Sequence, residues 1–143
     1  MTVKAILSAK GGEVLTIEPT TKLAAAVKLL AERNIGALVV TGPDRRVVGI
    51  VSERDIVKEL AAHGPAALDL PLTDVMTRKV MTCSIADTIS SVMEKMTEGK
   101  FRHLPVIEQG RLAGIVSIGD VVKHRLQQME HEQSALRDYI QTA

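Results

Sequence analysis

The sequence predicts an α/β (α+β) fold made of two pseudo-symmetric β-α-β-β-α repeats packed through their sheets, with an extended C-terminal helix. The first observation is an internal repeat, because residues 14–58 recur at 80–123. The second observation is that, in both copies, short apolar runs typical of strands alternate with segments whose apolar residues have helical spacing. The third is a segment without helix breakers, residues 121–142. Two copies at this period argue against a stacked solenoid, whose units usually number three or more.

The first copy is predicted to contain a strand, a helix, two strands and a second helix. Leu23, Val27 and Leu30 occupy positions i, i+4 and i+7, which predicts a helix that ends near Arg33. Thr21 stands where the N-cap of this helix is expected. The remaining elements are strands at 14–17, 37–40 and 47–51 and a helix that begins at Ser52.

The second copy repeats this order after a linker that contains Pro65 and Pro71, which cannot continue a helix. Ile89, Met93 and Met96 indicate its first helix, and Asp87 stands at the expected N-cap. Its predicted strands are 80–83, 103–107 and 112–116. We therefore divide the chain into a first repeat (1–66), a second repeat (67–125) and a C-terminal helical extension (126–143).

An apolar stripe runs along the C-terminal helix. It consists of Val122, Leu126, Met129, Leu136 and Ile140, and polar Gln133 fills the missing position of a nearly three-heptad a/d pattern. Such a stripe is typical of a helix that packs on its own domain or of a contact between subunits. The length of the helix beyond the repeat favours the contact between subunits.

Composition excludes several classes of function. The formal net charge of +1 provides no broad basic field, and two aromatic residues, Phe101 and Tyr139, provide no stacking platform, so nucleic-acid binding is not expected. No apolar run approaches the roughly 20 residues of a membrane span, and the N-terminus does not resemble a signal peptide. The single cysteine, Cys83, is expected to be a buried thiol in a reducing, cytoplasmic compartment.

Neither catalysis nor a metal site is predicted. The four histidines, His63, His103, His124 and His131, lie in different segments or too far apart on one helix to share an ion. No nucleophile is accompanied by a base and an orienting acid, and no glycine loop of the Walker type is present. We expect a protein that is not an enzyme and requires no cofactor.

Two Ser-x-x-Asp motifs occupy equivalent positions, Ser52 to Asp55 and Ser117 to Asp120, each between a strand and a helix. They fit a capping box, in which serine accepts an amide and the acid reaches back. A carboxylate there can also accept hydrogen bonds from a ribose diol, while the free amides of the helix N-terminus attract phosphate. The two roles are compatible, and the symmetric duplication favours nucleotide binding.

Several motifs of the repeat are specific: Val75-Met76-Thr77, Val80-Met81-Thr82, Arg102-His103-Leu104-Pro105-Val106 and the two Gly-Ile-Val-Ser-x-x-Asp blocks. Through them the repeat resembles a tandem pair of CBS (cystathionine β-synthase) domains. It resembles the small stand-alone bacterial members of that family through Ile6-Leu7, Lys10-Gly11, Asn34-Ile35-Gly36-Ala37-Leu38-Val39-Val40 and Ser52-Glu53-Arg54-Asp55. The resemblance implies a regulatory module that binds adenine nucleotides, such as AMP, ATP or NAD, in clefts between the repeats.

The resemblance also implies the composition of each cleft. One cleft combines Ser117, Gly119 and Asp120 with Ser8, Leu15, Ile35 and Gly36. The other combines Ser52, Arg54 and Asp55 with Thr77, Met81, Phe101 and Arg102. The set of expected nucleotide-binding residues is completed by Lys10, Ala37, His103 and Pro105. Lys10, Arg54 and Arg102 either reach phosphate or are solvated surface charges. Because Arg54 corresponds to Gly119, the two clefts are expected to differ in ligand or affinity.

We expect a homodimer that senses energy or redox state and signals through an unknown effector protein. The alternative is a regulatory subunit that docks on an enzyme or transporter and whose clefts are only structural.

Overall fold

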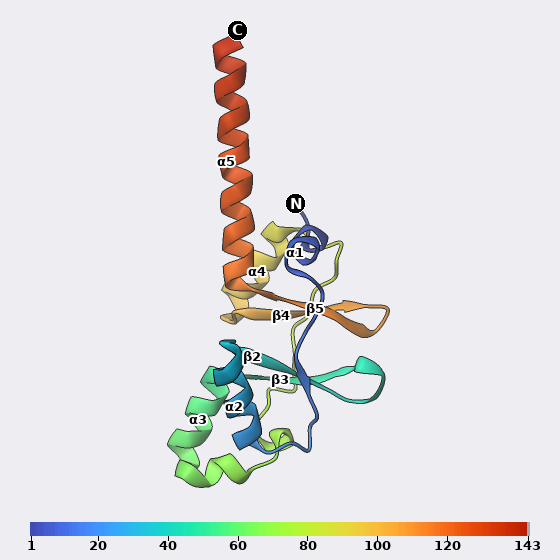
Figure 1. Cartoon of the computed structure of the whole chain (residues 1–143), viewed down its shortest axis with the longest axis vertical. Helices are drawn as coiled ribbons and strands as arrows, with labels where there is room; N and C mark the ends of the chain where they lie inside the picture. Colours follow the sequence, from blue (N-terminus) through green and yellow to red (C-terminus); the bar gives the residue numbers. More distant parts are fainter. Residues whose placement is uncertain (143) are drawn as a thin grey trace.

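The computed structural model describes residues 1–142 and has two small sheets, one from each repeat, which lie one above the other with helices around them (Figure 1). The elements of the first repeat are α1 (Val3–Lys10), β1 (Thr16–Ile17), α2 (Leu23–Arg33), β2 (Ala37–Thr41), β3 (Val47–Ser52) and α3 (Glu53–His63). Those of the second are α4 (Ile89–Gly99), β4 (His103–Glu108), β5 (Arg111–Ser117) and α5 (Ile118–Thr142). Short 3-10 turns are η1 (Pro43–Arg45), η2 (Gly64–Asp69) and η3 (Leu72–Asp74). The predicted fold class is confirmed.

The two sheets repeat the same pairing. In the first, β1 runs parallel to β2, and β2 is antiparallel to β3. In the second, β4 is antiparallel to β5, and only Cys83 of the predicted strand 80–83 forms a bridge, a parallel one to Val106. This bridge corresponds to the pair between Ile17 and Val40 one repeat earlier. The structure therefore keeps the symmetry but reduces that strand to one residue.

The segment that precedes each repeat packs on the other repeat. Val3 and Ile6 of α1 belong to the core of α4, β4 and β5, and α1 lies so close to β5 that a Cβ at Gly114 would come within 2.7 Å of Leu7. Conversely, η3 and the residues after it join the core of α2, β2 and β3. There Ile50 and Thr77 exchange two backbone hydrogen bonds of 3.0 and 2.9 Å. The two exchanged segments tie the repeats together.

The predicted N-caps of the first helix in each repeat are displaced by one residue. The N-cap of α2 is Lys22 rather than Thr21, and it forms no side-chain cap. The N-cap of α4 is Thr88, whose hydroxyl accepts a hydrogen bond from the amide of Ser91. Asp87 instead accepts a hydrogen bond from the amide of Ser84 in the preceding turn, which lowers the pKa of its carboxyl. Both caps were predicted wrongly because each helix starts one residue later.

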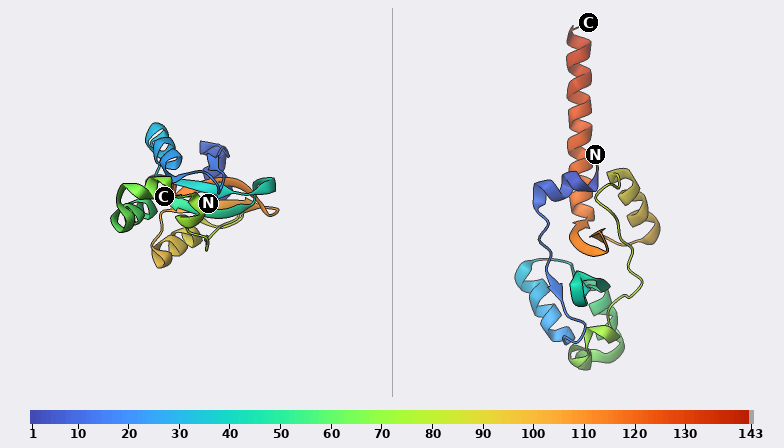
Figure 2. Two further views of the ribbon diagram at one scale, coloured as in Figure 1. Left: turned by 90° about the horizontal axis from the view of Figure 1, so that it is seen from below. Right: turned by 90° about the vertical axis from the view of Figure 1, so that its right-hand side faces the viewer.

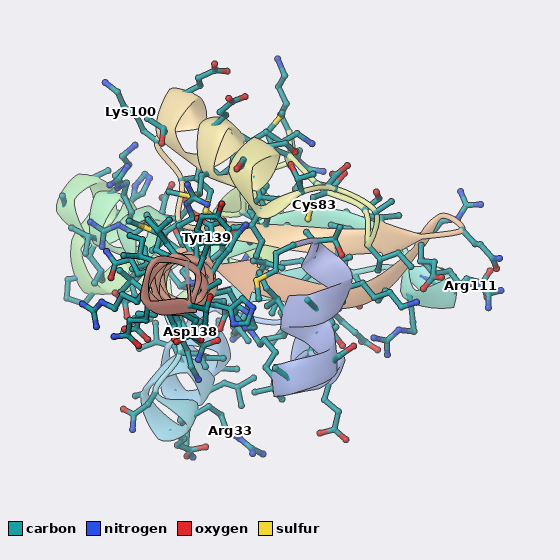
Figure 3. All side chains as sticks on the ribbon, turned by 90° about the horizontal axis from the view of Figure 1, so that it is seen from above. Arg33, Cys83, Lys100, Arg111, Asp138 and Tyr139 are labelled. Atoms are coloured by element: carbon teal, nitrogen blue, oxygen red, sulfur yellow. The ribbon has the colours of Figure 1, made fainter. Side chains whose placement is uncertain are left out.

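The helix α5 leaves the body of the protein and projects well beyond it (Figures 1 and 2). At its base Val121 and His124 are buried, and Val121 belongs to the core of the second repeat. From Met129 to Thr142 every residue is exposed. Figure 3 looks along this helix, with Asp138 and Tyr139 on its projecting end. More than half of α5, from Met129 to Thr142, is therefore covered by no other part of residues 1–142.

Candidate functional site

A cleft of about 540 Å³ lies between the repeats, and we call it the larger cleft. Four segments line it: the start of β2, the junction of β3 with α3, the loop after η3, and the loop before β4. It brings together all seven residues predicted for it, which are Ser52, Arg54, Asp55, Thr77, Met81, Phe101 and Arg102. Gly36, Ala37 and His103 also line it. The meeting of these segments follows from the exchanged packing, since residues after η3 pair with β3.

The carboxylate of Asp55 is held at the N-terminus of α3 by a complete capping box. Its Oδ2 accepts hydrogen bonds from the amide and the hydroxyl of Ser52, at 2.9 and 3.0 Å, and the amide of Asp55 donates to the Ser52 hydroxyl. Its Oδ1 accepts a hydrogen bond from Thr77 at 3.2 Å. A carboxylate offers about four acceptor positions, so about one remains unoccupied on this residue, which lines the cleft.

The larger cleft carries an excess of positive charge. Five cationic side chains line it, against the two carboxylates of Glu53 and Asp55. The five are Arg54, Lys58, Lys79, Lys100 and Arg102. The three lysines were not among the residues predicted from the sequence. Lys58 stands one helical turn after Arg54, so its spacing could have revealed it, whereas Lys79 and Lys100 come from loops whose placement depends on the tertiary fold. Such a cluster is suited to bind an anionic group.

A second cleft of about 400 Å³, the smaller cleft, lies at the equivalent position. Its lining includes six of the predicted residues: Lys10, Leu15, Ile35, Gly36, Ala37 and Ser117. His103 lines it as well. The structure adds Glu13, Val14, Asn34 and Ile115. The smaller cleft is less charged, because Lys10 is the one cation and Glu13 the one carboxylate among the residues that line it in the described chain.

An ion pair lies at the edge of the smaller cleft. The Nζ of Lys10 lies 2.6 Å from Oδ2 of Asp120 and also donates to the carbonyl of Ile115. The same carboxylate caps α5, because Asp120 accepts from the amide of Ser117 and donates its own amide to the Ser117 hydroxyl. Burial acts to raise the pKa of Asp120, but the bonds from Lys10 and Ser117 outweigh it and the pKa lies below its usual value.

Four predicted residues lie outside the linings of both clefts. One of them is Asp120, which is joined to the smaller cleft by its ion pair with Lys10, and the others are Ser8, Gly119 and Pro105. Ser8 is exposed on α1, because residues two apart on a helix point about 200° apart and Lys10 takes the inward direction. Gly119 lies in the first turn of α5 and lines a groove at the base of that helix. Pro105 is buried in β4, where it pairs with Ile115 and its carbonyl accepts a hydrogen bond from the amide of Cys83.

His103 lies between the two clefts and lines both. Its ring is so close to the chain of the other repeat that a Cβ added at Gly36 would come within 3.3 Å of Cε1. Burial, followed by the charge of Lys10, lowers the pKa of His103 below its usual value. The neutral imidazole therefore predominates near pH 7, and it separates the clefts without adding positive charge to either.

Residues 1–142 offer neither a cluster of metal ligands nor a membrane-spanning helix. In that range no group of three or more His, Cys, Asp or Glu side chains could hold a metal ion. No described helix is both long and apolar enough to cross a membrane. The thiol of Cys83 is buried, and burial raises its pKa to about 11. At neutral pH this thiol is protonated, so it is a poor nucleophile.

Comparison with known proteins identifies relatives of the whole fold. The CBS domain family model matches residues 3–62 and 72–127. The mitochondrial CBS domain-containing protein CBSX3 of Arabidopsis thaliana is 35% identical over 120 residues, which is 81% of this chain and 58% of that protein. This chain thus spans a little over half the length of that relative.

Solved structures extend the comparison to geometry. A CBS-domain containing protein from Agrobacterium tumefaciens has a TM-score of 0.85 and 47% identity, with 87% of this chain and 99% of that chain covered. The CBS domain protein PAE2072 from Pyrobaculum aerophilum, complexed with AMP, has a TM-score of 0.75 and 28% identity, with 84% and 89% covered. The CBS domain pair of protein MJ0100, in complex with 5′-methylthioadenosine and S-adenosyl-L-methionine, has a TM-score of 0.79 and 26% identity, with 90% and 98% covered.

Proposed function

Because this chain belongs to the CBS domain family, we propose that it is a regulatory, non-catalytic module that binds adenosine-containing ligands in its two clefts. The ligands would report the energy or redox state of the cytoplasm, and a further protein would carry the signal onward. Two neighbours of the same fold support the ligand class, since the compounds bound to them, AMP, 5′-methylthioadenosine and S-adenosyl-L-methionine, all contain adenosine.

The geometry of the larger cleft is the observation that carries the proposal. Asp55 presents an open acceptor position beside a helix N-terminus, where a ribose hydroxyl can donate to it. Met81 and Phe101 provide apolar surface for a base, and the cations supply charge for phosphate. One cleft thus contains separate groups for each part of a nucleotide.

The difference between the clefts suggests a division of ligands. Five cations favour a ligand with several phosphates, such as ATP or NAD, in the larger cleft. In the smaller cleft Lys10 already neutralises Asp120, so a ligand that uses this carboxylate has to share it with Lys10 or displace it. We therefore expect a ligand with less phosphate charge there, such as AMP.

Calorimetric titration of AMP, ADP, ATP, NAD and S-adenosylmethionine tests the proposal. Asp55→Ala should abolish one class of sites and Asp120→Ala the other. Asp138→Ala, on the projecting end of α5, is a matched control that should leave both unchanged. If none of the five compounds binds the unmodified protein at millimolar concentration, the proposal is wrong.

A second candidate function is a subunit that docks on an enzyme or transporter and uses its clefts only as structure. One observation favours it, because both Ser-x-x-Asp pairs form complete capping boxes and so have a structural role of their own. Affinity capture from native lysate with and without ATP distinguishes the two. A partner retained equally under both conditions supports docking, whereas capture that depends on ATP supports sensing.

We also propose that the protein is a homodimer. The stripe on α5 supports this, since Leu126 and Met129 are exposed although they are apolar. Replacing both by glutamate should shift the mass measured by light scattering toward the monomer. A stable monomer of the unmodified chain at micromolar concentration would contradict it.

A further inference from the structure

The projecting part of α5 carries an unpartnered apolar seam. The side chains of Val122, Leu126, Met129, Leu136 and Ile140 are between 44% and 65% exposed. Their spacing assigns Val122, Met129 and Leu136 to d positions of a heptad and Leu126, Gln133 and Ile140 to a positions. The seam runs from Val122 to Ile140, 19 residues whose ends lie about 27 Å apart along the helix. No part of residues 1–142 covers its outer half, because every residue from Met129 to Thr142 is exposed.

The charges that flank the seam indicate what covers it. Arg125 and Glu132 occupy g positions, and Glu130 and Arg137 occupy e positions. None of these four has an oppositely charged residue three or four positions away on its own helix. In the described chain Arg125 and Glu132 instead contact the neutral Gln128. The usual intrahelical ion pairs of an isolated surface helix are therefore missing from this stretch.

A parallel second copy provides the missing partners. In a parallel two-stranded coiled coil, a g residue lies beside the e residue five positions later on the other helix. Arg125 then faces Glu130 of the second copy, and Glu132 faces Arg137 of the second copy. Two-fold symmetry doubles both pairs, so these four charges are all matched, while Lys123, at the first e position, lies beside the uncharged Ile118 of the second copy.

An antiparallel arrangement is disfavoured by the same residues. The register that aligns both seams along their whole length places Val122 opposite Ile140 of the second copy. It then brings Glu130 close to its own counterpart and Lys123 close to Arg137. Like charges at these positions repel. Charge complementarity thus favours α5 of a second copy as the partner of the seam, in the parallel orientation.

We propose that two copies of this chain pair through α5 in a parallel, two-stranded coiled coil, an inference that rests on the proposed homodimer and specifies its interface. The seam continues into the body of the protein, because Val122 and Leu126 also line the groove at the base of α5. Arg102 lines this groove and the larger cleft as well. The parallel arrangement places the larger clefts of both copies at the same end of the assembly, each connected to the interface through Arg102.

Cysteine cross-linking of the full chain tests the direction. In a parallel pair the two copies of Ile140→Cys lie face to face at the seam, so mild oxidation should produce a covalent dimer. In the antiparallel pair they lie at opposite ends, about 27 Å apart, and cannot react. Asp138→Cys, at an outward f position, is the matched control and should remain uncross-linked. The buried native Cys83 should not contribute.

Charge exchange provides a second, independent measurement. Glu130→Arg replaces both attractive pairs with Arg125 by repulsive ones and should weaken dimerisation roughly two- to thirtyfold, as measured by analytical ultracentrifugation. Adding Arg125→Glu exchanges the two charges and should restore the affinity. Circular dichroism verifies that each variant keeps its fold.

The outcomes separate this inference from the proposed homodimer. A dimer whose Ile140→Cys variant does not cross-link, or whose exchanged pair is not restored, overturns the parallel coiled coil and leaves the homodimer standing. A chain that is monomeric throughout overturns both, and the seam would then serve a different protein. Neither outcome affects the nucleotide titrations.

Discussion

Asp55 and Asp120 should distinguish ribose from deoxyribose if the clefts bind adenosine ligands. The change in the ligand is the removal of the ribose 2′-hydroxyl, which is tested by comparing AMP with 2′-deoxy-AMP. The matched changes in the protein are Asp55→Asn and Asp120→Asn. Asparagine keeps one carbonyl oxygen that can accept the cap bond, but it replaces a charge-assisted acceptor by a neutral one. The capping geometry should survive while ribose recognition is lost.

The expected magnitude follows from the acceptor positions that the structure leaves open. Asp55 accepts three hydrogen bonds and keeps about one position free, so one hydroxyl can bind directly and a second has to displace Thr77. Asp120 accepts two, from Ser117 and Lys10, and keeps about two. Leaving a partly buried acceptor unpaired costs about 1–3 kcal/mol. The deoxy ligand should therefore bind roughly five- to 150-fold more weakly.

Calorimetry on the parent and both asparagine variants measures this difference. In each variant the ratio of AMP to 2′-deoxy-AMP affinity should fall toward one for the altered cleft and persist for the other. A melting temperature that changes little would verify that the cap is intact. If AMP and 2′-deoxy-AMP bind equally in all three proteins, the carboxylates are helix caps only and the reasoning from acceptor positions is refuted.

Three further predictions concern charge and packing. Because the pKa of Asp120 is depressed in the folded state, its ion pair stabilises the fold above about pH 4, and this stability is lost as the pH falls below that. Lys10→Met should therefore make the melting temperature depend less on pH between about pH 5 and pH 2, the range in which carboxyl groups titrate. An unchanged pH dependence would contradict the role of the pair. Arg54→Met should weaken ATP binding more than AMP binding, and added salt should narrow the difference; equal losses for both ligands in a titration would argue against a phosphate contact. Gly49→Ala should lower the free energy of unfolding by about 1–3 kcal/mol in denaturant titrations, since a Cβ there would lie 2.5 Å from the sulfur of Met76. If the variant is as stable as the unmodified protein, Met76 can move aside at no cost and the prediction is wrong.

Local patterns were sufficient to predict the elements and their symmetry. The repeat of residues 14–58 at 80–123 implies equivalent backbones, and periodicity identifies α2 and α4 because one face of each helix has to be apolar. The capping boxes at Ser52 and Ser117 were also readable, since cap and acid are three residues apart. The one-residue error at the caps of α2 and α4 reflects how weakly a boundary is encoded compared with a helix.

Contacts between distant segments required the tertiary structure. Lys10 and Asp120 are separated by 110 residues. The periodicity of the sequence does not indicate that the segment before each repeat packs on the core of the other repeat. Because residues 3–10 form the helix α1, Ser8 points away from the smaller cleft while Lys10 points toward it. If this segment were extended, both residues could contact the ligand. Sequence motifs therefore determined which groups are candidates to recognise a ligand. The packing of the two cores determined which of these groups share a cleft. The hydrophobic effect is non-directional, so which segments meet is decided only when all the apolar side chains of the chain are close-packed in the interior.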